Sequence, residues 1–483
     1  MLNHLSINRV NFVRRMTKKK DILEYVTIED FAAEAKCLTR VDGKVVFVEN
    51  SSPGDIVDIR ITRKKKNYLE ATPVHFHQFS TFRQEPFCSH YGSCGGCRWQ
   101  HINYEKQLDF KYQQVRDQFE RIGRIKDFEL LPVIGSASQK FYRNKLEYTF
   151  SNRRWISGDE IESGIELDRN GLGFHKPGQF DKVLDINTCH LQDDLTNRIR
   201  NAFKNYAKSN SIPFYDLKEH VGFLRNLIIR NSNTGEWMVI LQVKYYDKIL
   251  IQKLLNFLNK TFPEITSQYY IINSKRNESY QDLEAIHFSG RKYIMEKMEE
   301  LVFQIGPKSF FQTNSDQAYR LYSVVREFAN IKHDEIVYDL YSGTGSIALF
   351  IAKHAKKVIG FEYVEEAVMD AKLNSDLNKI GNTFFIAGDI KETIKSDIIR
   401  KFGKPDVVIS DPPRAGMHKD VIAGIIDAKP LRIIYVSCNP ATQARDIELL
   451  KEYYQPKKAQ PVDMFPQTHH IENIALLELK DHG

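Results

Sequence analysis

Cysteine is scarce in this chain, with 6 residues among 483, and three of the six fall within residues 88–97. So little cysteine excludes a disulfide scaffold. Long apolar runs are also missing, since no segment approaches the roughly 20 apolar residues that cross a bilayer. Residues 1–20 are basic but lack the apolar core of a secretory signal, so we expect a mobile arm or an overextended start, in a cytoplasmic protein. Clustered cysteines in that reducing compartment more often bind metal or catalyse reactions than form disulfides.

The composition is that of a globular protein, with 42% hydrophobic and 27% charged residues. A chain of this length is too long for one core, so we expect about two to four domains. The net charge of +7 is modest, but basic residues gather in short runs, among them Arg63–Lys66 and the pair Arg143 and Lys145. Such runs attract phosphate backbones, although solvated loops have the same composition.

The pattern of apolar and polar residues changes along the chain and predicts four segments. Short alternating strands around a Pro-Gly turn indicate a small β-barrel of the kind that binds oligonucleotides. A mixed α+β region follows, and from about Leu301 apolar strands alternate with amphipathic helices, as in a doubly wound α/β sheet. The predicted segments are a basic arm (1–23), the barrel (24–80), the α+β central domain (81–300) and the α/β domain (301–483).

The first strand of the α/β domain runs into "DLYSGTG", residues 339–345. Gly343 and Gly345 allow a tight turn and a close approach to a ligand at a helix N-terminus. The third glycine of the dinucleotide fingerprint is missing, because Ala348 stands in its place, so a phosphate-rich cofactor is not indicated. Glu362, at the end of the next strand, can accept both hydroxyls of a ribose. This pattern suits S-adenosylmethionine, and its alternative is a plain glycine turn with a surface glutamate.

Two further motifs, "ISDPPRAG" at 409–416 and "YVSCNPATQARD" at 435–446, follow strands of the same sheet. Asp411 stands where a strand ends, and two prolines stiffen the loop behind it. Cys438 also ends a strand, at the rim where sheets of this class hold ligands. Burial as a small hydrophobe is the alternative for this cysteine.

The motifs "SGTG", "DPPRAG" and "SCNP", with "SFFQTN" at 309–314, resemble the RNA uracil-5-methyltransferase family, in particular its 23S ribosomal RNA branch. The resemblance covers nearly the whole chain. It implies a Rossmann-like S-adenosylmethionine methyltransferase domain, an N-terminal OB-like TRAM barrel and an α+β central domain. The implied activity is methylation of uridine C5 in 23S ribosomal RNA to 5-methyluridine.

The resemblance also implies roles for single residues. Uracil C5 is a poor nucleophile until a thiolate adds at C6, and Cys438 is the implied thiolate. A base must then remove the C5 proton, and Glu472 in "THHIENIALL" holds that place in the family. Phe310 could stack on the target base, but we expect it in the core. The implied cofactor residues are Gln312, Tyr341, Ser346, Glu362, Asp389 and Asp411.

The cluster "CSHYGSCGGC" contributes Cys88, Cys94 and Cys97, and we expect Cys189 in "INTCHLQ" to be the fourth ligand. Three close cysteines with one remote favour iron–sulfur over zinc, without excluding zinc. The resemblance adds that the ribosomal branch carries a [4Fe–4S] cluster on these four positions. We expect it to tie the loop to the strand near 189 and to shape an RNA-binding surface with Arg98, Trp99 and "FYRNK". Cys37 is expected to be buried and to belong to neither site.

Four other interpretations stay open at this stage. The same chemistry could act on transfer RNA. An iron–sulfur radical enzyme that modifies tRNA has a similar combination of parts, but with three residues in the first cysteine gap. An amino-methyltransferase would place an aromatic residue where this chain has Arg414. A non-catalytic RNA-binding protein would not need Cys438. We expect a monomer.

Overall fold

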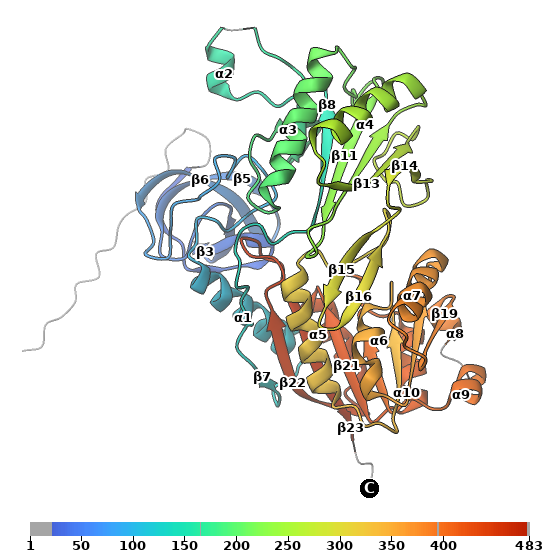
Figure 1. Ribbon diagram of the computed structural model, residues 1–483. Helices are drawn as coiled ribbons and strands as arrows, with labels where there is room; N and C mark the ends of the chain where they lie inside the picture. The colour runs from blue at the N-terminus through green and yellow to red at the C-terminus, as the bar shows by residue number, and fades with distance from the viewer. Residues whose placement is uncertain (1–21, 165, 394–395, 481–483) are drawn as a thin grey trace, which may run out of the picture. The chain divides into compact units, whose positions relative to one another are not determined.

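A computed structural model describes residues 22–164, 166–393 and 396–480 (Figure 1). The predicted basic arm therefore lies almost entirely outside the described residues. The chain divides into two compact units, of which the first is Met1–Phe87 with Arg98–Gln107, and the second is Cys88–Cys97 with Leu108–Gly483. Among the helices in the described ranges, none combines the length and the apolar composition that a membrane crossing requires.

The first unit contains β structure, as expected, in a six-stranded sheet ordered β1-β5-β6-β4-β3-β2. Inward-facing Val46, Val57 and Ile59 form its core. Cys37 is fully buried there, as expected, and its thiol donates to the carbonyl of Ser51 over 3.1 Å. The elements are β1 (Ile22–Thr27), β2 (Asp30–Phe31), η1 (Ala33–Ala35), β3 (Cys37–Val41), β4 (Lys44–Val48), β5 (Ile56–Lys64) and β6 (Tyr68–Gln78).

A seven-stranded sheet, ordered β10-β9-β8-β11-β12-β13-β14, builds the central part of the second unit. Helices α3 and α4 pack on it, with the rings of Tyr206 and Phe257 stacked at 3.9 Å between them. The strands are β8 (Lys145–Ser151), β9 (Gly171–Lys176), β10 (Gln179–Asp185), β11 (Leu224–Asn231), β12 (Trp237–Val243), β13 (Ile265–Ile272) and β14 (Ile286–Gly290). The helices are α1 (Tyr104–Arg121), which spans both units, α2 (Gly158–Glu162), α3 (Asp194–Ser209) and α4 (Lys248–Thr261).

The C-terminal part is the predicted doubly wound sheet, ordered β19-β18-β17-β20-β21-β23-β22-β7. Its first five strands are parallel, and β23 runs antiparallel to β21. The chain reverses direction across the sheet between β17 and β20, where such sheets bind ligands. The strands are β7 (Glu129–Leu130), β17 (Ile336–Leu340), β18 (Lys357–Glu362), β19 (Thr383–Ala387), β20 (Val407–Ser410), β21 (Arg432–Ser437), β22 (Tyr454–Val462) and β23 (Glu472–Leu479).

Both faces of this sheet are covered, because successive residues of each strand point to opposite sides. Val337 packs with α5, α6 and α7, whereas Tyr338 packs with α1, α10 and α11. A hairpin, β15 (Ile294–Met298) and β16 (Leu301–Ile305), precedes the sheet. The helices and turns are α5 (Ser315–Ala329), α6 (Ser346–Ile351), η2 (Ala352–His354), α7 (Glu365–Leu377), α8 (Ile390–Thr393), α9 (Ser396–Phe402), α10 (Lys419–Ala428) and α11 (Pro440–Leu450).

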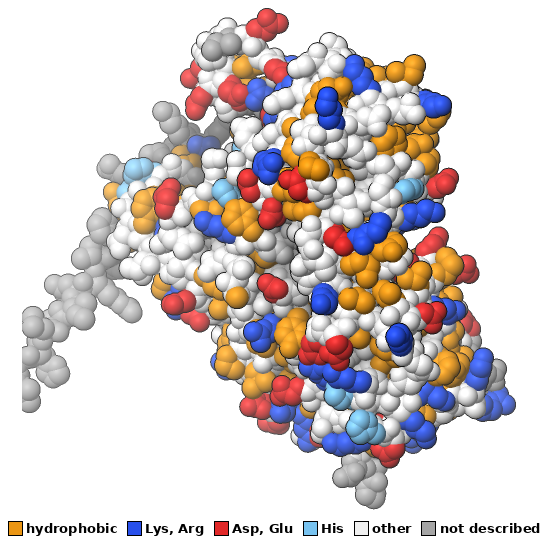
Figure 2. Space-filling view, viewed as in Figure 1, with side chains coloured by type: hydrophobic (Ala, Val, Ile, Leu, Met, Phe, Trp, Pro, Cys, Tyr) orange, Lys and Arg blue, Asp and Glu red, His pale blue; other side chains and the backbone are white. Residues whose placement is uncertain are grey.

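Charged side chains of both signs are mixed on the face drawn in Figure 2. On the face drawn in Figure 2, Lys and Arg side chains alternate with Asp and Glu side chains, with apolar groups scattered between them. This face therefore offers no broad patch of one sign, in keeping with the modest net charge. Attraction of a polyanion to this face would depend on small local clusters of cations.

Candidate active site

The glycine loop between β17 and α6 has the geometry that its sequence predicts. Tyr341, Gly343 and Gly345 all have positive φ, at 63°, 53° and 78°. A Cβ on Gly345 would lie 2.9 Å from the ring of Phe385, so this position needs glycine for packing. A Cβ on Gly343 would meet nothing within 4 Å. The loop is therefore closely packed behind Gly345 and open at Gly343, where a ligand can approach the backbone.

Glu362 ends β18 and holds this loop. One carboxylate oxygen accepts the N–H of Gly343 over 3.0 Å, and the other accepts the N–H of Val364 over 2.9 Å. Each oxygen keeps a lone pair for a further donor, because a carboxylate accepts up to about four hydrogen bonds. Glu362 can therefore anchor the loop and still accept the hydroxyls of a ribose.

Asp339 in β17 is a candidate site residue that the sequence analysis did not name. Its side chain is buried, and neither oxygen has a hydrogen bond of good geometry within the described part of the chain. Burial and the charges of Asp411 and Glu362 raise its pKa well above the usual value, and the N–H of Ala348 lowers it only in part. An orphaned buried carboxylate is costly unless it meets a cation or a proton. The site thus fits a positively charged ligand such as a sulfonium or an ammonium group.

Asp411 follows β20 directly across the switch point, with its N–H donating to the carbonyl of Leu340 over 3.3 Å. Burial raises the pKa of Asp411 to about 7. The hydroxyls of Tyr322 and Ser346 lie 2.8 Å apart behind the glycine loop. Burial raises the pKa of this tyrosine, and Asp411, Asp339 and Glu472 add to the increase. Residues from five segments therefore converge at one edge of the sheet.

Cys438 and Glu472 lie side by side because β21 and β23 are paired. Ser437 is opposite Asn473 in the antiparallel register. Cys438 directly follows Ser437, and Glu472 directly precedes Asn473, so the two are adjacent across the pair. Cys438 is partly buried, and burial, together with the charge of Glu472, raises the pKa of its thiol to about 11. Glu472 is 6% exposed, and burial and Asp411 raise its pKa well above the usual value. A thiol and a buried carboxyl group thus lie side by side at the edge of the sheet.

Arg414, which follows the two prolines, is the second residue that the sequence analysis missed. Its guanidinium charge lowers the pKa values of both Cys438 and Glu472, against the larger effect of burial. It also lies 3.2 Å from Nδ1 of His470. The side chains of Asn439 and Thr442 donate to its backbone carbonyl, each over 3.1 Å. Arg414, whose positive charge favours a thiolate, is therefore fixed in place. The sequence offered no signal for it beyond its position in "DPPR".

The "SFFQTN" segment lies against the glycine loop. Gln312 is buried, and its carbonyl accepts a hydrogen bond from the side chain of Asn144 over 2.9 Å. The hydroxyl of Thr344 donates to the carbonyl of Phe310 over 3.2 Å. The expectation that Phe310 packs in the core is wrong, because its side chain is 66% exposed while Phe311 takes the buried position. An exposed ring next to the cofactor loop can instead stack on a base.

Asp389 follows β19 and is partly exposed. Its carboxylate accepts the N–H of Lys391 over 3.1 Å at the start of α8. Its charge also raises the pKa of Tyr341, after the larger effects of burial and Asp446. Asp389 therefore belongs to the same edge of the sheet as the glycine loop.

The four predicted metal ligands lie in one neighbourhood. Cys94 and Cys97 pack against the core that contains Cys189, and the charge of Cys88 contributes to the raised pKa of Cys189, which burial dominates. The N–H of Asn187 donates to Nε2 of His90 over 3.1 Å, so loop 88–97 is attached to the segment before Cys189. Within the described residues, however, no group of three or more His, Cys, Asp or Glu side chains is arranged to hold a metal ion.

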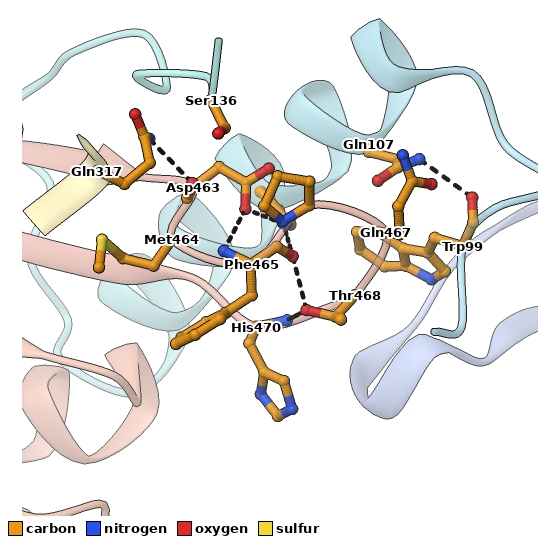
Figure 3. A network of polar contacts seen from close by, with 12 residues as sticks. Trp99, Gln107, Ser136, Gln317, Asp463, Met464, Phe465, Gln467, Thr468 and His470 are labelled. Atoms are coloured by element: carbon orange, nitrogen blue, oxygen red, sulfur yellow. Dashed lines mark hydrogen bonds and ion pairs between the residues drawn. The ribbon is translucent and has the colours of Figure 1, made fainter. Parts of the chain in front are cut away.

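The loop that leads to Glu472, residues 463–471, is held by a polar network (Figure 3). The carboxylate of Asp463 accepts the N–H of Phe465 over 3.0 Å, and its carbonyl accepts a hydrogen bond from Gln317 over 2.9 Å. The hydroxyl of Thr468 accepts the N–H of His470 over 3.3 Å. Buried Lys111 donates to Asp463 over 2.5 Å. The loop is thus fixed from both the helix α1 and the helix α5.

Two family models match parts of this chain. The family model for tRNA (uracil-5-)-methyltransferase matches residues 284–480, and the TRAM domain model matches residues 24–74. An RNA methyltransferase of Bacteroides thetaiotaomicron is 53% identical over 453 residues, covering 93% of this chain and 100% of the relative. Another from Porphyromonas gingivalis is 50% identical over 459 residues, covering 93% and 98%.

A solved structure extends the likeness to the whole fold. The crystal structure of Pyrococcus abyssi tRNA (uracil-54, C5)-methyltransferase in complex with S-adenosyl-L-homocysteine has a TM-score of 0.73 and 28% identity, covering 94% of this chain and 100% of that one. Fold and site thus define an S-adenosylmethionine-dependent RNA methyltransferase. Within that class, the chain belongs to the RNA uracil-5-methyltransferase family, with an N-terminal TRAM domain. The predicted fold and family are confirmed.

Proposed function

We propose that this protein methylates C5 of a uridine in 23S ribosomal RNA, giving 5-methyluridine. The observation that carries the proposal is the strand pairing that sets Cys438 beside Glu472, with Asp411 and Arg414 around them. Support for a ribosomal substrate comes from the cysteine set and the barrel, which are features of the branch that the sequence resembles. We also propose that the protein acts as a monomer in the cytoplasm.

Cys438 is the proposed nucleophile. Its thiolate, favoured by Arg414, adds to C6 of the uracil, and the displaced electron pair makes C5 nucleophilic. Bound S-adenosylmethionine supplies the methyl group that becomes bonded to C5. The carboxylate of Glu472 takes the C5 proton, the C6–S bond breaks, and its electron pair returns to the sulfur as the ring is restored.

The proposed cofactor site is the edge around the glycine loop. Asp339 belongs to it as well, because its orphaned buried carboxylate suits a cationic ligand. Glu362 is the proposed acceptor of the ribose hydroxyls, since both oxygens are already oriented by backbone donors. The proposed residues are Gln312, Tyr341, Ser346, Glu362, Asp389 and Asp411, with Asp339 added from the structure.

The first test uses RNA that contains 5-fluorouridine, whose C5 fluorine cannot leave as a proton. Incubation with S-adenosylmethionine should give a covalent protein–RNA adduct, seen as a shifted band in a denaturing gel. Cys438→Ala should give no adduct and no methyl transfer, whereas Cys37→Ala should give both. An adduct that survives Cys438→Ala would contradict the mechanism. An absence of adduct from the wild type would favour the radical enzyme or the non-catalytic RNA-binding protein.

Transfer RNA is the second candidate substrate. The observation in its favour is the solved structure of similar fold, which is named for a tRNA (uracil-54, C5)-methyltransferase. Mapping of 5-methyluridine in ribosomal and transfer RNA from cells that lack the protein separates the two. Loss from 23S RNA alone supports the ribosomal proposal, and loss from transfer RNA alone overturns it.

We further propose that Cys88, Cys94, Cys97 and Cys189 hold a structural [4Fe–4S] cluster. Their location in one neighbourhood and their thiol chemistry support this, because four cysteines are the usual ligand set. Protein purified without oxygen should contain about four iron atoms and about four sulfides per chain. Cys189→Ser should lose the iron and lower the midpoint of thermal unfolding, while the matched variant Cys37→Ser should keep the iron. Wild-type protein free of iron after anaerobic reconstitution would refute the cluster.

A further inference from the structure

We propose that the barrel of the first unit carries a stacking site for a base of single-stranded RNA, formed by Tyr25 and continued by the basic hairpin between β5 and β6. The inference rests on the proposed function only in taking RNA as the substrate. It assigns a contact to residues far in sequence from the catalytic motifs.

Tyr25 presents an open aromatic ring at the surface of the first unit. Its side chain is 66% exposed. One face of the ring is stacked on the imidazole of His77, with centroids 3.8 Å apart and planes 14° from parallel. His75 meets His77 edge-on at 4.7 Å. The tyrosine thus ends a stack of rings at the surface. A flat group from solution can extend this stack.

Asp58 holds this stack rigid. Its Oδ1 accepts the backbone N–H of Tyr25 over 2.9 Å and lies 2.7 Å from Nε2 of His77. In the register of β5 with β6, Asp58 is opposite His75. A single carboxylate therefore fixes the backbone below the exposed ring and the imidazole behind it. A platform fixed in advance loses less conformational entropy on binding than a mobile side chain.

The backbone at Tyr25 is strained in the way that functional sites often are. Its φ is 52°, which is unfavourable for a residue with a bulky side chain. The register of β1 with β5 is also irregular between Leu23 and Val26. A bulge of this kind redirects a side chain. A strained turn that leaves most of a large ring exposed, although one face is stacked on His77, is a candidate for a ligand contact.

Cations extend from the stack along one face of the barrel. In β5, Val57 and Ile59 are buried, so Asp58 and Arg60 alternate onto the outer face. The strand then runs into the exposed residues Arg63–Lys66 of the hairpin. Lys64 lies six positions beyond Asp58, or roughly 20 Å along the strand. Phosphates of a strand whose base stacks on Tyr25 can reach these cations.

Single-stranded RNA is the ligand that this chemistry favours. Stacking on an aromatic ring is tolerant of sequence because every base has a flat face, and duplex RNA hides those faces. The cations supply attraction to the backbone, which a purely apolar partner would not use. The combination of a fixed ring and a basic hairpin is the usual design of single-strand sites.

The test measures binding of the full-length protein to a fluorescent oligouridylate and to a hairpin duplex by fluorescence anisotropy. Tyr25→Ala should weaken binding of the single strand about tenfold, or about 1.4 kcal/mol. Tyr25→Gly should weaken it equally while keeping the fold, since glycine accepts a positive φ. Tyr25→Phe should bind like the wild type. Phe180→Ala removes a ring that is 74% exposed in the other unit, and it is the matched control expected to change nothing.

The hairpin gives a second, independent readout. Replacing Lys65 and Lys66 with Ala should flatten the plot of log affinity against log salt concentration by about 1.4, because each phosphate contact on a single strand contributes about 0.7. Tyr25→Ala should lower the affinity without changing this slope, since stacking releases no counterions.

Unchanged affinity in both Tyr25→Ala and Tyr25→Gly would overturn the proposal. So would an equal loss of affinity for the duplex, which would point to a general backbone contact or to an indirect effect on the barrel. Failure of the proposed function is measured separately, by the absence of a Cys438 adduct with 5-fluorouridine RNA. The Tyr25 variants should still form that adduct at saturating RNA, with a higher KM and an unchanged kcat.

Discussion

Glu472→Gln is expected to leave RNA covalently attached to Cys438. Glutamine fits the buried position of Glu472 but cannot accept the C5 proton, so the methylated ring cannot release the sulfur. Turnover should fall by about 10²- to 10⁴-fold, the usual contribution of a general base. The first methyl transfer should survive and accumulate as an adduct on ordinary uridine RNA. Denaturing gels with labelled RNA and labelled methyl donor measure both quantities.

The matched control for this change lies on the same strand. Glu478→Gln alters a partly exposed carboxylate of β23 that faces Lys457 at 3.6 Å, and its turnover should equal that of the wild type. A Glu472→Gln enzyme that turns over normally would remove Glu472 from the mechanism. Because burial and Asp411 raise the pKa of Glu472, its active, ionised form is lost as the pH falls. The wild-type kcat should therefore rise with pH.

Lys111→Met is expected to destabilise the second unit and to disorder the loop before Glu472. Lys111 and Asp463 are both fully buried, with Nζ and Oδ1 2.5 Å apart. Lys111 also donates to the carbonyl of Phe465 over 3.3 Å. Removing one partner leaves an uncompensated buried charge, which costs about 3–5 kcal/mol. Adduct formation with 5-fluorouridine RNA should fall as well, because the loop carries His470, the contact of Arg414.

Urea unfolding followed by circular dichroism measures the loss of stability. The double variant Lys111→Met with Asp463→Leu should regain part of it, since an apolar pair leaves no buried charge. The control is Lys451→Met, which breaks a more exposed pair with Glu448 (2.7 Å) and should cost less than about 1 kcal/mol. A Lys111→Met protein as stable as the wild type would show that the pair is not needed to hold the loop.

The sequence was sufficient for the architecture of the C-terminal domain. Alternation of apolar strands and amphipathic helices indicates a doubly wound sheet, and strands of one direction must place their carboxyl ends at one edge. Asp411, Cys438 and Glu362 were therefore predicted to face a common site. The glycine pattern also indicated the loop geometry, because Gly345 has no room for a side chain.

The sequence was not sufficient for residues whose role depends on neighbours. Asp339 looks like any polar residue in a strand, and only its burial without a hydrogen-bond partner among the described residues marks it. The sequence analysis noted Arg414 only because an amino-methyltransferase would have an aromatic residue at that position. Its effect on Cys438 depends on how two loops fold. Phe310 and Phe311 are chemically alike, so nothing local could tell which ring is exposed.

Taken alone, the order of residues determined the class of sheet, the strand ends that carry polar groups and the family to which the chain belongs. The tertiary structure decided which distant groups meet: Glu472 beside Cys438, Lys111 beneath the loop of Asp463, and Tyr25 on a ring held by Asp58. The reason is physical. Local patterns record which faces are apolar, whereas the register between strands and the burial of a charge depend on the whole packed chain.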